Sequence, residues 1–300
     1  MKMLKKETVL REPIILISAV SFFILPYLLH LGINGIQPGP SRTFFGSDQT
    51  IKVRVGNTME SMQLDAYLLG ALARIGNSGY CDETLKALTV VLRSNAFYAI
   101  MNEQAMEREN FYSDEELRIL WGSEYEKNVQ RYRDVIASTE GIVIFYQGEI
   151  IRVPFHTISA GATRGGAALG EDFPYVHSVE SSEDMYAEEY YTTIEIPLGT
   201  FGDSFDIEAR DEWGYVLSVC VGDEVINGET FRKSYGLPSA CFDYEKTEEN
   251  YIFRVRGIGH GFGLSIYGAE YLGQKGYRFG EILEYYFFDI EIRKENRNDV

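Results

Sequence analysis

Cysteine is scarce in this 300-residue sequence: there are three, Cys81, Cys220 and Cys241, and none forms a C-x-x-C pair. An odd count excludes a framework in which every cysteine is bridged. One disulfide is feasible, but three free, buried thiols fit better. Histidine is scarce too. His156 and His177 flank a loop with no cysteine and no carboxylate pair at metal-ligand spacing, so we expect no metal and no cofactor.

Positive charge is also in short supply. The sequence has 28 Lys and Arg against 45 Asp and Glu, which gives a formal net charge of -17. This balance argues against nucleic-acid binding, so any basic site must be local. The sequence also lacks the G-x-x-x-x-G-K-[ST], G-x-S-x-G, H-E-x-x-H and S-x-x-K motifs, heptads and internal repeats. The common nucleotide-binding and hydrolase classes therefore have no support.

Charged residues are absent from residues 13–33, an apolar run long enough to span a bilayer as one helix. Four basic residues precede the run and the next one is Arg42, which predicts a cytoplasmic N-terminus. A cleaved signal peptide is the alternative, but the run is long for one and no A-x-A site follows. We predict a cytoplasmic tail at 1–12, a transmembrane signal anchor at 13–33, a linker at 34–50, and an extracytoplasmic domain at 51–300 on a single-pass cell-membrane protein.

The predicted external domain mixes helical and strand patterns. Apolar residues recur at helical spacing in 64–75 and 85–96, with Asp82 as the N-cap of the second helix. Further elements are a helical region at 113–141, a hairpin at 142–156 that turns at Gln147-Gly148, strands at 51–55, 192–198, 205–226 and 251–257, and two helices within 259–287. This order is not a regular βαβ series, so the fold class is α+β.

Four segments have chemical interest. The turn "IGNSGYC" at 75–81 contains no carboxylate. In "IGHGFGLSIYG" at 258–268, glycines surround His260 and would let a ligand approach the backbone, but a strand-to-helix turn explains them equally well. Arg93, on an apolar helix, is either a site residue or, as the sequence alone favours, a snorkelling surface residue. The acidic run at 180–191 is more typical of a solvated face.

Several runs occur in the order and spacing of one known family: "LDAYLLGALARIG", "DETLKALTVVLRSNAFY", "FHTISAGAT", "GLPSACF", "GIGHGFGLSIYGA" and "GEILEYYF", across about residues 50–293. In these runs the chain resembles the SpoIID/LytB family. The resemblance implies one SpoIID-type extracytoplasmic domain behind an N-terminal anchor. It also implies a peptidoglycan lytic transglycosylase that acts on septal cell wall during engulfment in sporulation, with an amidase of the SpoIIP type and a SpoIIM-like membrane protein as partners.

The family's reaction needs one carboxylic acid, which protonates the glycosidic oxygen while the sugar's own 6-hydroxyl attacks. Counting along the matched motifs places Ile75 where the family has this catalytic Glu. Isoleucine cannot transfer a proton. The main hypothesis is therefore a pseudoenzyme that binds cell-wall glycan strands with weak or no catalysis.

The resemblance also implies roles for other residues. The glycan-binding candidates are Arg93, His260, Ser265, Tyr267 and Gly268. Of the zinc ligands reported in some members, only His156 is matched. One alternative is an active lytic transglycosylase whose acid is displaced to Glu60, Asp65, Asp82 or Glu83. Another is an amidase enhancer of the LytB type.

Overall fold

The computed structural model describes residues 49–166, 173–202 and 204–295. The chain divides into Met1–Gly46 and a compact unit, Ser47–Val300, and all described residues belong to the second. The predicted anchor and nearly all of the predicted linker lie outside the described residues. Within the described residues, no helix combines the length and the apolar character needed to cross a bilayer.

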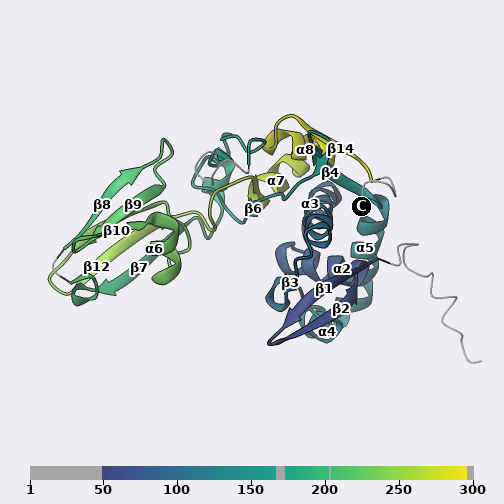
Figure 1. Ribbon diagram of the computed structural model, residues 1–300, viewed down its shortest axis with the longest axis horizontal. Coiled ribbons are helices and arrows are strands. Elements are labelled where there is room, and N and C mark those ends of the chain that lie inside the picture. The colour runs from purple at the N-terminus through teal and green to yellow at the C-terminus, as the bar shows by residue number, and fades with distance from the viewer. Residues whose placement is uncertain (1–48, 167–172, 203, 296–300) are drawn as a thin grey trace, which may run out of the picture. The chain divides into compact units, whose positions relative to one another are not determined.

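Helices and strands alternate irregularly along the chain, which confirms the α+β class (Figure 1). The helices are α2 (Leu64–Ile75), α3 (Asp82–Met101), α4 (Asp114–Trp121), α5 (Tyr125–Ser138), α6 (Gly228–Ser234), α7 (Ile266–Gln274) and α8 (Phe279–Tyr286). The strands are β1 (Thr50–Val55), β2 (Thr58–Gln63), β3 (Met106–Glu107), β4 (Ile142–Tyr146), β5 (Glu149–Ile150), β6 (Phe155–His156), β7 (Tyr191–Pro197), β8 (Phe205–Arg210), β9 (Val216–Val221), β10 (Glu224–Asn227), β11 (Phe242–Lys246), β12 (Asn250–Arg256), β13 (Leu264–Ser265) and β14 (Ile290–Lys294).

Helix α3 is the central element of the helical part. It contacts α2, α5, α7, α8 and β4. The helical spacing of apolar residues explains this packing, since Leu68 and Leu72 of α2 and Leu85 and Leu88 of α3 are completely buried. Burying each such side chain is worth about 1.5–3 kcal/mol. These contacts fix the end of α2 relative to the middle of α3.

Two three-stranded antiparallel sheets enclose a second core. Their strand orders are β10-β9-β8 and β11-β12-β7. The shared core is largely aromatic and includes Phe205, Phe231, Phe242, Tyr251 and Phe253. Such rings supply large buried areas and prefer edge-on or offset contacts. The short helix α6 packs against β9.

The predicted hairpin at 142–156 is confirmed at its turn as β4 and β5, but its second strand ends at Ile150, and Phe155–His156 pairs elsewhere. Gln147 and Gly148 both adopt positive φ, 52° and 86°, as a two-residue hairpin turn requires. Strand β14 pairs with the other edge of β4. Strand β6 pairs in parallel with β13, which places His156 beside Ser265. Two distant motifs of the sequence therefore meet at this pair.

Two local predictions need correction. The N-cap of α3 is Cys81, because Asp82 already has helical geometry and forms an ion pair with Arg131 at 2.7 Å. All three cysteines are free, but only Cys241 is buried, while Cys81 and Cys220 are half-buried at a helix start and on β9. Strand β2 was not predicted, because none of its side chains is fully buried and no apolar alternation marks it.

Candidate functional site

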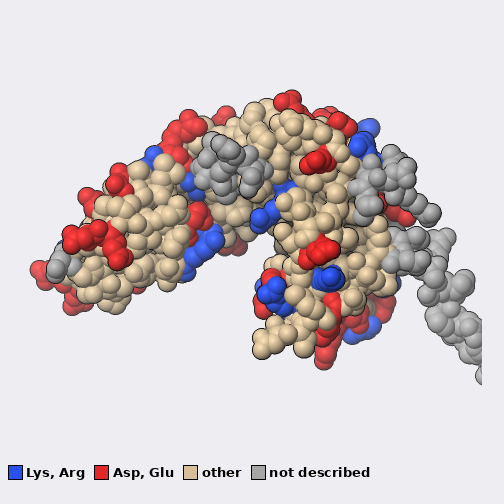
Figure 2. All heavy atoms as spheres, viewed as in Figure 1, with Lys and Arg blue, Asp and Glu red and all other residues tan. Residues whose placement is uncertain are grey.

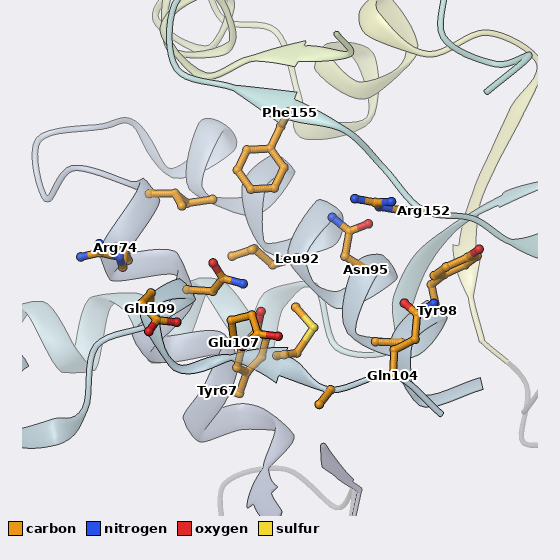
Figure 3. A pocket seen from close by; sticks show the side chains of 15 residues that line it. Tyr67, Arg74, Leu92, Asn95, Tyr98, Gln104, Glu107, Glu109, Arg152 and Phe155 are labelled. Atoms are coloured by element: carbon orange, nitrogen blue, oxygen red, sulfur yellow. The ribbon is translucent and has the colours of Figure 1, made fainter. Parts of the chain in front are cut away.

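A cleft of about 650 Å³ opens beside the C-terminal end of α2. Its walls come from the end of α2, the middle of α3 and segment 104–110, and Arg152 and Phe155 complete it (Figure 3). The lining combines aromatic rings with side-chain amides: Tyr67, Tyr98, Phe155, Asn95, Gln104 and Asn110. Rings can stack on a sugar face, and amides can both donate to and accept from hydroxyl groups.

Two sets of hydrogen bonds hold the lining segments against the helices. The backbone NH of Tyr112 donates to the Gly70 carbonyl at 3.1 Å, and a Cβ at Gly70 would collide with the Tyr112 carbonyl. Glycine is therefore needed at this point of α2. On α3, the Asn95 amide donates to the Val153 carbonyl at 2.9 Å and accepts the Val153 NH at 2.6 Å. The segments on both sides of the cleft are thus fixed to α2 and α3.

Ile75 lines this cleft. It is the last residue of α2 and is half-buried. Two carboxylates also belong to the lining, on Glu107 and Glu109, and Glu107 lies 3.5 Å from the Arg54 guanidinium. The position that the family resemblance assigns to the acid therefore faces a cleft, but its side chain is apolar.

The four carboxylates considered as replacements do not line the cleft. Asp82 and Glu83 form ion pairs at the start of α3. Glu60 is exposed on β2. Burial raises the pKa of Asp65 to about 6, but its side chain lies outside the lining.

Arg74 and Arg152 place two guanidinium groups in the cleft lining. Neither has a carboxylate within ion-pair distance among the described residues, although Arg74 contacts the Tyr112 ring at 5.0 Å. In Figure 3 they lie at opposite sides of the cleft, with Leu92 between them. Acidic side chains form scattered patches on the surface visible in Figure 2, and most described arginines are paired with a carboxylate, for example at Arg54 and Arg254. The lining therefore contains two arginines and two carboxylates, Glu107 and Glu109, so it offers guanidinium groups without an excess of positive charge.

Arg93 is buried, with only 4% of its surface exposed, so the expected snorkelling position is wrong. Its guanidinium donates to the carbonyls of Thr139 at 2.6 Å, Ile136 at 3.1 Å and Ile142 at 3.2 Å. These carbonyls lie at and just beyond the C-terminal end of α5, where helix carbonyls need partners. Burial lowers the pKa of Arg93 to about 10. Arg93 does not line the cleft, and its glycan-binding role stays a prediction.

Ser265 and Gly268 belong to a buried polar cluster around Asp184. The Ser265 hydroxyl donates to Asp184 Oδ2 at 2.7 Å and accepts the Gly268 NH at 3.3 Å, which caps α7. The Ser159 NH donates to the same carboxylate oxygen at 2.6 Å. Asp184 is completely buried, and burial raises its pKa. The expectation that the acidic run at 180–191 is solvated is therefore wrong at this residue.

Tyr267 and His260 are both half-buried. Tyr267 packs against Ile158, Ala187 and Tyr190. His260 Nδ1 accepts the NH of Phe262 at 3.0 Å. Neither residue lines the cleft, and their predicted glycan-binding roles, like those of Ser265 and Gly268, are not tested by these positions.

The two candidate metal-binding histidines have separate environments. His156 is buried, its Nδ1 bonds to the Phe262 carbonyl at 3.1 Å, and burial lowers its pKa to about 3. His177 stacks on Phe288 at 4.4 Å. Among the described residues, no three His, Cys, Asp or Glu side chains converge as a metal site.

Arg164 was not singled out in the sequence, yet it joins the loop after β6 to the sheets. Its guanidinium is 3% exposed and pairs with Asp211 at 2.8 Å and Glu229 at 3.2 Å. It also lies over the rings of Tyr215 and Phe262, at 4.8 and 4.4 Å. One buried arginine thus connects the glycine-rich loop to β8–β9 and α6.

Comparison with known proteins finds a family model and named relatives whose sequences are similar to this chain. Residues 54–146 match the family model "SpoIID: Stage II sporulation protein", a segment that contains α2, α3, Ile75 and most of the cleft lining. Over this segment the chain is similar to the SpoIID family. It is 26% identical over 259 residues to "Stage II sporulation protein D" of Bacillus subtilis (strain 168), covering 78% of this chain and 76% of that protein. The protein of the same name from Bacillus amyloliquefaciens is 24% identical over 260 residues, with 79% and 76% covered.

Sequence reasoning on the SpoIID family motifs missed much of the cleft. Gln104, Glu107, Glu109 and Asn110 lie in a segment without regular periodicity, and Arg152 follows a hairpin strand. Only the resemblance pointed to Ile75. The scarcity of basic residues could have drawn attention to Arg152. In a strongly acidic chain, each arginine without a carboxylate partner is a candidate for anion binding.

Proposed function

We propose that this chain is a membrane-anchored sporulation protein of the SpoIID type that binds peptidoglycan glycan strands at the septal cell wall during engulfment, with weak or no lytic activity. The observation that carries the proposal is Ile75, which lines the cleft at the position matched to the family's catalytic Glu. The cleft persists with its rings and amides, while the group that would protonate the glycosidic oxygen is replaced by an alkyl chain.

The cleft suits a glycan whose stem peptides have been removed. Each such strand bears a lactyl carboxylate on every second sugar. Arg74 and Arg152 offer guanidinium groups without carboxylate partners in the described part of the chain, and guanidinium matches a carboxylate in shape and charge. An amidase of the SpoIIP type would produce these carboxylates, which is a chemical reason to propose it, with a SpoIIM-like membrane protein, as a partner.

The second candidate function is an active lytic transglycosylase with a displaced acid. The observation that favours it is the presence of Glu107 and Glu109 in the cleft lining. Glu107 already forms an ion pair with Arg54 at 3.5 Å, whereas Glu109 has no ion-pair partner among the described residues. Glu109 is therefore the carboxylate to test within this alternative.

The test uses the full-length chain in detergent with glycan strands that an amidase has stripped of peptides. Mass spectrometry detects 1,6-anhydro ends, and co-sedimentation measures binding. We expect the native chain to bind without forming anhydro ends and Ile75→Glu to form them, while the isosteric control Ile75→Gln forms none. Anhydro ends from the native chain that disappear in Glu109→Gln would establish the second candidate. Failure of the native chain to sediment with the strands would contradict glycan binding.

A further inference from the structure

Strand β2 is a free edge of the sheet that borders the cleft. The sheet has the order β2-β1-β3, and both residues of β3, Met106 and Glu107, line the cleft. Strand β2 lies at the opposite edge, where no described strand pairs with its outer side. None of its side chains is fully buried. Such an edge offers backbone NH and carbonyl groups to any extended segment that reaches it.

The register of the hairpin determines which backbone groups of β2 point outward. A two-residue turn connects β1 to β2, and its first residue, Gly56, has a φ of 58°, as a type II′ turn requires. Val55 and Thr58 therefore form a hydrogen-bonded pair, and such pairs alternate with non-bonded pairs along an antiparallel ladder. The NH and carbonyl groups of Met59 and Ser61 consequently point away from β1.

The other long edge strands carry features that prevent edge pairing, namely charged side chains, proline and bulges. Strands β11 and β14 each contain three charged residues. Strand β8 also contains three, and register shifts interrupt its pairing with β9. Strand β7 contains one and ends at Pro197. With Glu60 as its single charged residue, no proline and an unbroken register, β2 is the least protected described edge of five or more residues.

The sequence of β2 is compatible with antiparallel pairing to a second copy of itself. With a two-fold axis at Ser61, the two copies of Ser61 exchange NH–carbonyl hydrogen bonds, Met59 faces the partner's Gln63, and Glu60 faces the partner's Met62. No like charges lie directly opposite each other in this register, an arrangement that would weaken the pair. The two three-stranded sheets then form one sheet of six strands, which is a common size.

The N-terminal part of the chain favours a second copy as the occupant of this edge. Thr50, the first residue of β1, pairs with Gln63, which is two positions from the axis at Ser61. With about 3.4 Å per residue and about 4.8 Å between strands, the two copies of Thr50 lie about 20 Å apart. The predicted linker at 34–50 can span up to about 55 Å, so two copies with predicted anchors in one membrane can pair. Confinement to that membrane raises their effective concentration.

We propose that β2 is a self-association surface through which two copies of this chain pair edge to edge. The inference goes beyond glycan binding and rests on the proposed function only for the membrane anchor. Since β3 of each copy lines a cleft, the dimer carries two clefts at opposite edges of one continuous sheet. It can therefore hold two glycan segments at a fixed separation.

The test measures the dimer dissociation constant of the full-length chain in detergent by sedimentation equilibrium. We expect the native chain to associate reversibly, and Ser61→Lys or Ser61→Glu alone to weaken the dimer about fivefold, because residue 61 then meets a like charge. An equimolar mixture of the two variants should associate at least as tightly as the native chain. The matched control Ser123→Lys makes the same change at an exposed residue of the turn Gly122–Glu124 and should leave the dimer unchanged.

Amide hydrogen exchange reports on the edge directly. Exchange at Met59 and Ser61 should slow as the protein concentration rises, whereas Glu60, already bonded to β1, should exchange slowly at every concentration. A monomeric native chain, equal effects of Ser61→Lys and Ser123→Lys, a mixture no tighter than its components, or unchanged exchange at Ser61 in the dimer would each overturn the proposal. Binding of a short peptide-free glycan, which occupies one cleft, tests the proposed function separately and should be unchanged in Ser61→Lys.

Discussion

The cleft wall and the glycine-rich loop differ in whether their polar groups have partners within the protein. Along the cleft, Arg74 and Arg152 have no carboxylate partner among the described residues. Ile75 is an apolar residue at the position where the family resemblance led us to expect a carboxylic acid. In the loop and the start of α7, Ser265 and Gly268 are turned inward onto the completely buried Asp184. Ser265 and Gly268 of the loop motif therefore form hydrogen bonds within the fold, whereas the side chains of Arg74 and Arg152 have no carboxylate partner in the described part of the chain.

This contrast separates two kinds of variant. Substitutions in the Asp184 cluster should change stability, because they break packing and buried hydrogen bonds. Substitutions of the unpaired cleft arginines should change glycan affinity with little change in stability. Ser265 and Gly268 of the glycine-rich motif therefore have a structural role that does not depend on a reaction.

The largest effect is expected from Gly268→Ala. A Cβ at this position would lie 2.6 Å from Ser181 Oγ and would also collide with Tyr286 Oη, both in side chains that are buried. We expect a loss of about 1–3 kcal/mol in the free energy of unfolding, as for other overpacked sites, measured by denaturant titration.

The matched control is Gly280→Ala in α8, where a Cβ would meet nothing within 4 Å. Alanine favours helix over glycine by up to about 1 kcal/mol, so this variant should be as stable as the native chain or more so. A Gly268→Ala protein of native stability that had lost glycan affinity would show that the loop is a binding surface after all.

A smaller effect is expected in the pH dependence of stability. Burial lowers the pKa of His156 to about 3 in the folded chain, against about 6.5 when unfolded. Between these values the unfolded chain binds the proton more readily, so acidification below about pH 6.5 should cost up to about 1.4 kcal/mol per pH unit from this residue.

The measurement is the free energy of unfolding against pH, compared between the native chain and His156→Asn. The Asn side chain keeps an NH donor near the position of Nδ1. Burial raises the pKa of Asp65 to about 6, so protonation of Asp65 on acidification favours the folded chain. This contribution is the same in both proteins. His156→Asn should unfold with a shallower loss of stability between pH 6.5 and 5. Identical slopes in the two proteins would show that His156 titrates normally when folded.

Periodicity and turn chemistry predicted most of the fold. The hairpin at Gln147-Gly148, the helices α2 and α3, and the α+β class follow from local patterns that the tertiary contacts reinforce. The surroundings of Arg93 and Asp184 did not follow, because burial of a charged residue depends on carbonyls and hydroxyls brought from distant segments. The cleft was predictable only at Ile75, since its other walls come from irregular segments whose positions depend on contacts at Gly70 and Asn95.

The smallest effect is expected from a substitution in the cleft, at Arg152. Its backbone carbonyl accepts the Tyr175 hydroxyl at 2.6 Å, a contact that any substitution retains, and its side chain is exposed. Arg152→Gln should therefore change the free energy of unfolding by less than about 0.5 kcal/mol. It should weaken binding of peptide-free glycan by about 1 kcal/mol, or roughly fivefold, the value of one exposed charge contact, as measured by titration calorimetry. Arg152→Lys should recover part of this affinity, because it restores the charge without the planar two-point contact. An Arg152→Gln chain that is destabilised as much as Gly268→Ala would remove the distinction between the two regions, because the cleft arginine would then be part of the fold.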